Sequence, residues 1–308
     1  MEHEMNVDFG RASDGPADWL REAPRAPLAK PLSCRFGGAS VPHPDKMKAG
    51  QKAVARANGG HGGEDSYFMA AGRDGSFVFG VSDGVYMWRE QGIDAGEFSR
   101  GLMHESAKAV AAGCVSPMAL LRKAFKRVSA TGEVKGSATV CIAQLDGRLG
   151  ELQSANVGDS GYLLMTPSRY PREGGIKYRS PHQEHEFGRP FQLGHHAASD
   201  KPDDAMVAAH PVASGDAVVM GSDGLWDNLH DSEIAELLVE GLRLRESPAA
   251  LARRIIAAAY EASLAKSGST PYAQAATEEF DMVYSGGKRD DISVIVVIVE
   301  TAATPLAT

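Results

Sequence analysis

Two stretches of the chain end an apolar run on the same turn, GVSDGVYMW at Gly80–Trp88 and VVMGSDGLWDN at Val218–Asn228. In each, Ser, Asp and Gly follow the apolar residues, which is typical of a buried β-strand that ends at an aspartate. A single Asp-Gly pair indicates no more than a turn, because Asp bonds its own backbone and Gly tolerates positive φ. Two such pairs at strand ends suggest a shared purpose.

The chain of 308 residues is long enough to bury a sizeable core. No clear linker interrupts residues 36–300, so the sequence predicts one domain there. Residues 1–35 mix acidic residues, Pro, Gly and Ala without a period and are expected to form a flexible arm. Residues 301–308 are expected to be a short C-terminal tail. The arm is acidic, whereas a transit peptide is rich in Arg and Ser.

Composition excludes several classes of protein. The formal charge of -8, with scattered basic residues, argues against nucleic acid as a ligand. No apolar run approaches the roughly 20 residues that span a membrane. Cys34, Cys114 and Cys141 show no CxxC spacing, so neither a zinc site nor a disulfide framework is indicated. We expect a soluble, intracellular monomer in a reducing compartment, with Cys141 as a buried, inert thiol.

The order of elements indicates an α+β fold. Residues 67–81 predict a β-hairpin, and helices are expected from about Asp94, from Ser116, over 232–244 and over 247–265. The runs 137–145, 151–157 and 161–165 suggest an antiparallel meander, and further strands are expected near 216–223 and at 292–300. Because regular βαβ alternation is absent, antiparallel sheets covered by helices fit better than a parallel sheet. Two sheets with a helix pair outside each would make a four-layer α/β/β/α sandwich.

Acidic residues recur where the predicted strands begin or end. They are Glu64, Asp65, Asp83, Asp159, Asp223, Asp290 and Asp291. Carboxylates gathered at one edge of a sheet system would repel each other unless a cation neutralised them. Oxygen ligands without His or Cys select hard cations, so the sequence predicts Mg²⁺ or Mn²⁺.

These motifs and their order resemble the metal-dependent protein phosphatases of the 2C type. The family carries an E-D pair before a strand, D-G after one, G-D-S, S-D-G-x-x-D and R-D-[ND]-[IM]-[ST]-V, and the match covers roughly residues 36–300. The segments VPHPDK, GGEDSYF, FSRGLM, QEHEFGRPFQL and GGKRDDISV are similar to the mitochondrial and chloroplast branch, which includes photosystem II core phosphatases. The resemblance implies phosphorylated proteins as substrates and the chloroplast stroma or a mitochondrion as compartment. If the N-terminus shown is native, the cytoplasm is expected instead.

The resemblance also implies roles for individual residues. Two ions would be held by Glu64, Asp83, the Gly84 carbonyl, Asp223 and Asp290, with Asp83 bridging them and with Asp83 and Asp223 essential for catalysis. Asp65 would orient waters around the ions, Asp159 would hold a third ion with Asp223, and Asp291 would support the ligands from behind. Water activated by two ions would hydrolyse phosphoserine or phosphothreonine without a phosphoenzyme.

Three departures from the family pattern concern the site. Val85 stands where well-studied relatives carry a His proposed as general acid, and Val85 cannot transfer a proton. Tyr86 and Met87 replace glycines, and packing under a loop is preferred over reshaping the rim of the site. Gly60 takes the position of a phosphate-holding Arg. Lys46, Lys48 and Arg56 lie nearby in sequence, and each is interpreted as a solvated surface charge.

Alternatives remain open at this stage. A phosphatase-like binding protein with weakened catalysis would explain Val85 and the absent Arg, although complete metal ligands argue against it. A phosphatase of small phosphorylated metabolites would use the same chemistry. The segment with His182, His185, His195 and His196 lacks helical metal-ligand spacing. His185 is therefore interpreted as a hydrogen-bonding, packed side chain.

Overall fold

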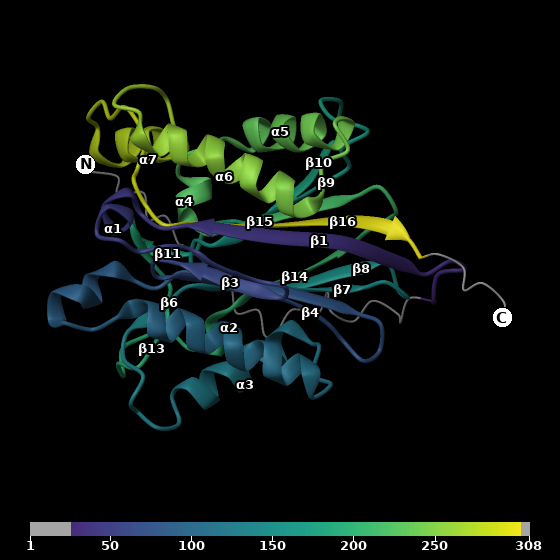
Figure 1. The fold of residues 1–308 in the computed structure, drawn as a ribbon, viewed down its shortest axis with the longest axis horizontal. Helices are drawn as coiled ribbons and strands as arrows, with labels where there is room; N and C mark the ends of the chain where they lie inside the picture. Colours follow the sequence, from purple (N-terminus) through teal and green to yellow (C-terminus); the bar gives the residue numbers. More distant parts are fainter. Residues whose placement is uncertain (1–25, 303–308) are drawn as a thin grey trace, which may run out of the picture.

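The computed structural model describes residues 26–302, which form two antiparallel sheets packed face to face (Figure 1). One sheet has the order β1 (Leu32–Val41), β16 (Ile292–Thr301), β15 (Ala217–Gly221), β9 (Gly161–Met165), β10 (Ile176–Arg179). The other has the order β14 (Met206–Pro211), β8 (Glu151–Val157), β7 (Val140–Asp146), β5 (Phe77–Ser82), β4 (Asp65–Ala71), β3 (Gly59–Gly62), β2 (Val54–Arg56). Every pair of neighbouring strands is antiparallel.

A pair of helices covers the outer face of each sheet. Helices α2 (Ala95–Ala111) and α3 (Pro117–Val128) lie against the seven-stranded sheet, and α5 (Asp231–Arg243) and α6 (Pro248–Leu264) lie against the five-stranded sheet (Figure 1). Three apolar layers result, one between the sheets and one under each helix pair. The predicted α/β/β/α sandwich is confirmed.

Local signals place the helices as expected. The Asp94 side chain accepts a hydrogen bond from Gly96 N–H and caps α2, and Ser247 caps α6 through Ala250 N–H. Proline occupies the first turn of α3 and α6, where its missing N–H leaves no helical bond unmade. The hairpin predicted over 67–81 is formed by β4 and β5.

The predicted three-strand meander is wrong at its last strand. Strands β7 and β8 pair as expected, but the turn after β8, with Gly158 at φ 103°, carries the chain into the other sheet, where β9 pairs with β15 and β10. The run GYLLM is apolar at every position because β9 is covered on both faces. Leu163 packs under the helices, and Leu164 packs between the sheets.

Several elements lie outside the predicted pattern. Strand β1 begins at Leu32, inside the predicted arm, and residues 1–25 of that arm fall outside the described residues, as do residues 303–308 of the predicted tail. Short segments α1 (Pro44–Lys48), a 3₁₀ turn at Tyr86–Gln91 (η2) and α4 (Asp223–Trp226) border the acidic residues, and α7 (Pro271–Phe280) lies beyond them. Small pairings join β11 (Glu184–Glu186) with β12 (Arg189–Pro190), and β6 (Ser137–Ala138) with β13 (Leu193–Gly194). Within residues 26–302, no helix is both long and apolar enough to cross a membrane.

Candidate metal centre

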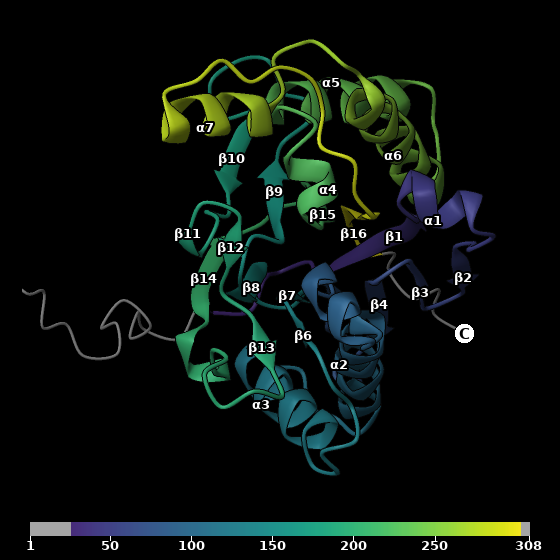
Figure 2. The same cartoon turned by 90° about the vertical axis from the view of Figure 1, so that its left-hand side faces the viewer.

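The acidic residues meet at one end of the sandwich. Glu64 immediately precedes β4 and Asp83 immediately follows β5, and the pairing of Ser66 with Ser82 brings these two ends together. From the other sheet, Asp223 follows β15 at the start of α4, and Asp290 and Asp291 precede β16. Figure 2 views the molecule from this end, with α4 near the middle and α1 to its right. Both sheets therefore deliver carboxylates to one place.

A cleft of about 1050 Å³ opens over these residues. Its walls include seven of the eight predicted site residues: Glu64, Asp83, Gly84, Asp159, Asp223, Asp290 and Asp291. The eighth, Asp65, is fully buried behind them, where its Oδ2 accepts a hydrogen bond of 2.6 Å from Ser222 Oγ. Ser222 Oγ in turn accepts from Ser293 N–H at 3.0 Å, so Asp65 links the two sheets beneath the cleft.

Burial and mutual repulsion raise the pKa values of most of these acids. Burial, followed by the charges of Asp65 and Asp223, raises the pKa of Asp83 well above its usual range. Burial and the charge of Asp223 raise the pKa of Asp290 to about 7, and the same two causes raise the pKa of Asp159. Each shift favours a neutral carboxyl, so a cation in the cleft would relieve a standing electrostatic cost.

Lys288 lies among the acids of the five-stranded sheet. Its Nζ is 2.5 Å from Asp223 Oδ2, 2.6 Å from Asp227 Oδ2 and 3.3 Å from Asp290 Oδ2. Burial alone would raise the pKa of Asp223, but the charge and hydrogen bond of Lys288 outweigh it, so that pKa is lowered. Sequence reasoning missed Lys288 and Asp227. The available signals were the lysine two residues before Asp290 in GGKRDD and the second acid of S-D-G-x-x-D.

Two more cations contact Glu64 on the other sheet. Lys46 Nζ forms ion pairs with Glu64 and Asp291, and the Arg89 guanidinium hydrogen-bonds Glu64 Oε1. The interpretation of Lys46 as a surface charge is wrong, because its side chain is only 7% exposed. Helix α1 directs it inward, since the backbone N–H of His43 is held by Asp291 at 2.6 Å. Lys48 is 73% exposed, and Arg56 is also exposed, as predicted.

The donors present fit a hard divalent cation. Within residues 26–302, no three His, Cys, Asp or Glu side chains are arranged as a ready set of ligands. Several of the carboxylates are instead paired with Lys46, Arg89 or Lys288. The buried oxygens without a hydrogen-bond partner nevertheless include Asp65 Oδ1, Asp159 Oδ1 and Asp223 Oδ1 of this cluster. Such oxygens are costly unless something binds them, and oxygen-only donors select Mg²⁺ or Mn²⁺.

The backbone carbonyl of Gly84 is not used by the pairing of its neighbours. Gly84 and Ala138 face each other in a β-bridge whose two hydrogen bonds are made by the residues on either side of them. Thr139 N–H donates to the Asp83 carbonyl, and Val85 N–H donates to the Ser137 carbonyl. The Gly84 carbonyl is therefore not consumed by this bridge. A Cβ at Gly84 would lie 2.6 Å from the Ala95 carbonyl oxygen, so only glycine fits there.

Asp291 is fully engaged by the protein. Its carboxylate accepts from His43 N–H at 2.6 Å, from Glu64 N–H at 2.8 Å, and from Lys46 Nζ. Gly63 has φ +64°, and a Cβ there would collide with this carboxylate. Asp291 thus ties α1 and the start of β4 to the start of β16 and fixes the backbone of Glu64.

The rim of the cleft differs from the expectation for Tyr86 and Met87. These side chains are 61% and 71% exposed, so the interpretation that they pack under a loop is wrong. The 3₁₀ turn η2 points them outward, and Trp88 packs instead, with its Nε1–H donating to Ser137 Oγ at 2.5 Å. The Tyr86 ring centroid lies 5.7 Å from Lys46 Nζ and 5.6 Å from Arg89 Cζ.

Gly60 cannot carry the arginine found at this position in the family pattern. Strands β2 and β3 form a hairpin, and a Cβ at Gly60 would lie 2.7 Å from Tyr67 Oη and closer still to the Val54 carbonyl oxygen. The stretch AVARANGGH, which includes β2 and the start of β3, therefore fills the space that a long side chain would need.

His185 and Cys141 are packed as predicted, and His182 lines the cleft. His185 Nε2 is 2.9 Å from Asp200 Oδ1, and its ring stacks on Phe191 with centroids 3.8 Å apart, which confirms the packing interpretation. His182 lines the cleft beside Arg179, and burial with that charge lowers its pKa to about 4. Cys141 is fully buried, and burial raises its pKa to about 12, as expected of an inert thiol.

Known proteins are similar to this chain in sequence and in fold. A family model described as Stage II sporulation protein E (SpoIIE) matches residues 90–300. Probable protein phosphatase 2C 55 of Arabidopsis thaliana is 36% identical over 270 residues, covering 87% of this chain and 52% of that protein. The chain thus spans about half the length of this curated relative.

Solved structures share the fold. The X-ray structure of the photosystem II phosphatase PBCP matches with a TM-score of 0.70 and 31% identity, covering 88% of this chain and 100% of that one. The catalytic domain of serine threonine protein phosphatase PstP, in complex with 2 manganese ions, matches in fold with a TM-score of 0.53 and 18% identity, covering 87% and 99% of the two chains. The chain belongs to the protein phosphatase 2C family.

Proposed function

We propose that this chain is a metal-dependent protein serine/threonine phosphatase, a phosphoric monoester hydrolase. The observation that carries the proposal is the convergence of carboxylates from both sheets on one cleft, with the buried oxygens of Asp159 and Asp223 left without hydrogen bonds. Two Mg²⁺ or Mn²⁺ ions would be held by Glu64, Asp83, the Gly84 carbonyl, Asp223 and Asp290. Asp159 and Asp223 would hold a third.

When bound, such ions activate water for in-line attack on phosphorus and neutralise the phosphoryl oxygens. The protein's own residues set up this chemistry. Asp65, fixed by Ser222, and Asp291, fixed by His43 and Glu64 backbone N–H groups, hold the loops that carry the ligands. The buried Cys141 supplies no nucleophile, which agrees with direct hydrolysis rather than a covalent phosphoenzyme.

Arg89 is the residue that we propose to hold the substrate phosphate. It is the basic side chain that reaches Glu64 from the rim, where it keeps 35% exposure, whereas Lys46 is buried against Glu64 and Asp291. An exposed guanidinium can turn toward an incoming phosphate and bind two of its oxygens at once. Val85 cannot donate a proton, so a water or another residue of the cleft would supply the proton of the leaving serine or threonine oxygen.

The cleft favours a phosphorylated protein over a small metabolite. One part of its wall carries Phe187, Tyr272 and Phe280, and another carries the exposed Tyr86 and Met87. Aromatic side chains around an open cleft suit the extended backbone and apolar side chains of a polypeptide. A small phosphoester would leave most of this surface unused.

A phosphatase-like binding protein is the second candidate, because one observation favours it. Lys46, Arg89 and Lys288 neutralise part of the acidic cluster without any metal ion. In a protein of this kind, these lysines and the arginine would remain in place permanently, and the cleft would recognise a partner without hydrolysing it.

Similarity to a photosystem II phosphatase also supports a chloroplast location, which we include in the proposal. A fluorescent fusion of residues 1–308 in a photosynthetic cell tests this part independently. Fluorescence that coincides with chlorophyll supports it, and a mitochondrial or diffuse cytoplasmic signal contradicts it.

The decisive experiment is hydrolysis of a phosphothreonine peptide by the purified chain in Mn²⁺, with EDTA as the metal-free control. Asp83→Asn and Asp223→Asn should each lower the rate by about two orders of magnitude or more, because they remove proposed ligands. Asp203→Asn changes the charge equally at an exposed site bound to Arg122 and should have no effect. A small phosphoester run in parallel separates the protein phosphatase from the metabolite phosphatase. A lack of hydrolysis with Mn²⁺ binding retained in calorimetry would favour the binding protein.

A further inference from the structure

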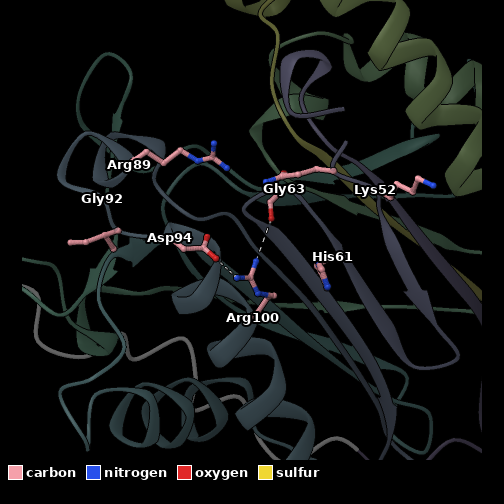
Figure 3. Close-up of a pocket in the computed structure, with 9 residues that line it drawn as sticks. Lys52, His61, Gly63, Arg89, Gly92, Asp94 and Arg100 are labelled. Carbon is pink, nitrogen blue, oxygen red and sulfur yellow. Dashed lines mark hydrogen bonds and ion pairs between the residues drawn. The ribbon is translucent and has the colours of Figure 1, made fainter. Parts of the chain in front are cut away.

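We propose that a second cavity, beside the metal centre, is an anion subsite that binds another acidic group of the same substrate, a phosphate or a carboxylate. This inference rests on the proposed phosphatase function and extends it to substrate selection. The cavity has a volume of about 570 Å³ and lies against β3, η2 and the start of α2 (Figure 3).

Positive charge dominates the lining of this cavity. Its charged residues are Lys52, Arg89 and Arg100, against one acid, Asp94. Arg89 is also paired with Glu64 of the metal centre, so Lys52 and the remaining donors of Arg100 carry most of the attraction for an anion. The carboxylate of Asp94 is already used, because it accepts from Gly96 N–H at 2.9 Å and from Arg100 Nη2 at 2.6 Å. In a chain whose formal charge is -8, such a grouping stands out, and it would attract anions rather than metal ions.

Arg100 is held ready to bind. Figure 3 shows its guanidinium between Asp94 and the Gly63 carbonyl, to which it donates at 3.4 Å. A guanidinium has five N–H donors, so these two contacts leave others for a ligand. Burial, followed by the charges of Arg100 and Arg56, lowers the pKa of His61, which lines the same cavity.

The cavity is connected to the metal centre through shared residues. Gln51 and Arg89 line both the cavity and the acidic cleft. Gly63, whose carbonyl Arg100 contacts, directly precedes Glu64 of the metal centre. A substrate whose phosphorylated residue enters the cleft would therefore bring a neighbouring acidic group to the cavity.

A phosphate and a carboxylate on an extended peptide both present negatively charged oxygens to the cavity. A phosphothreonine and a glutamate both offer oxygens that a guanidinium binds through paired hydrogen bonds. We therefore expect the enzyme to prefer substrates that carry a second phosphate or a carboxylate a few residues from the scissile phosphate. The two sources differ in charge, and the experiment treats them separately.

The test compares phosphothreonine peptides with neutral flanks, with one glutamate, and with one further phosphothreonine, placed one to four residues on either side. Wild type should show a kcat/KM about fivefold higher for the best acidic peptide than for the neutral one, mainly through KM. Lys52→Glu should abolish this preference and leave hydrolysis of the neutral peptide unchanged. Lys48→Glu is the matched control, because Lys48 lies nearby, is 73% exposed and lines neither cavity.

A direct binding measurement keeps the subsite testable apart from catalysis. Fluorescence anisotropy of the same labelled peptides in EDTA should show tighter binding of the acidic peptides to wild type and to Lys48→Glu than to Lys52→Glu. If neutral and acidic peptides are hydrolysed and bound equally well, the subsite is refuted while the phosphatase function stands. If no peptide is hydrolysed, the phosphatase function fails, and the anisotropy alone decides whether the cavity binds anions. If the glutamate and phosphothreonine peptides differ in kcat/KM or in affinity, the better one shows whether the subsite takes a carboxylate or a phosphate.

Discussion

Lys288 offers a sharp test of how this site is neutralised. Lys288→Met keeps the length of the side chain and removes the ammonium that contacts Asp223, Asp227 and Asp290 at 2.5, 2.6 and 3.3 Å. In the metal-free protein these acids would then face one another without that cation. The variant should therefore be less stable than wild type when no metal is present.

The size of the effect follows from burial. Removing one partner of a buried ion pair costs about 3–5 kcal/mol, because the remaining charge is left unpaired. The Lys288 side chain retains 32% exposure, so water screens part of the interaction, and about 2–3 kcal/mol is the better figure. For a domain of this size, that loss lowers the Tm by about 5 °C.

Metal should reverse the loss. A divalent ion bound by the same acids supplies the missing positive charge, and binding at a hundred times Kd adds about 2.7 kcal/mol. Thermal melts with EDTA and with Mn²⁺ therefore give the readout, and Mn²⁺ should raise the Tm of Lys288→Met more than that of wild type. Lys48→Met is the control, since its exposed pair with Asp45 contributes little.

Two results would refute this reasoning. One is a metal-free Lys288→Met protein that melts within about 1 °C of wild type, which would mean that the lysine does not neutralise the cluster. The other is an equal deficit with and without Mn²⁺, which would mean that the lysine and the metal do not serve the same acids.

Three further predictions concern the same end of the molecule. Burial and the charge of Asp223 raise the pKa of Asp290 to about 7. Burial also raises the pKa of Asp227, to about 6. In the metal-free protein, these two acids bind more protons in the native state than in the unfolded chain from about pH 4 to 7. His182, whose pKa is lowered to about 4, acts in the opposite direction below about pH 6.5. The urea midpoint should therefore fall from about pH 6.5 to about pH 8, whereas Mn²⁺, which competes with protons, should reverse the trend. Arg89→Ala should raise KM for a phosphopeptide about tenfold with little change in kcat, and Arg89→Lys should recover part of the loss; a change in kcat alone would contradict phosphate binding. Gly60→Ala should destabilise the protein by about 1–3 kcal/mol in urea unfolding, because its Cβ meets Tyr67 Oη, and an unchanged midpoint would show that the β2–β3 hairpin adapts freely.

Sequence patterns predicted the parts of the fold that depend on local chemistry. Asp94 and Ser247 cap helices through backbone N–H groups two and three residues away, so their signals lie within one turn. Asp83 and Asp223 were located because an aspartate that ends an apolar run marks a strand end in any context. The resemblance to a family then supplied the sandwich, which periodicity alone left open.

Contacts between distant segments were beyond local patterns. Lys288 meets Asp223 across 65 residues of chain, and Lys46 meets Asp291 across 245, so neither pairing has a signal in its own neighbourhood. The prediction for β9 was wrong for the same reason. The run GYLLM would pair equally well with β8 or with β15. Only packing between the two sheets selects its partner.

The departures from the family pattern are linked to one another in this structure. The β2–β3 hairpin closes the space above Gly60, so an arginine cannot approach the metal centre from β3. Arg89 approaches instead from η2, the 3₁₀ turn that begins at Tyr86, where relatives carry glycine. An arginine in this place lines both the acidic cleft and the basic cavity, which a side chain buried in the hairpin could not do. Moving the phosphate-binding group to the rim would therefore couple phosphate binding to the choice of substrate, and Arg89→Ala should weaken the preference for acidic peptides as well as raise KM.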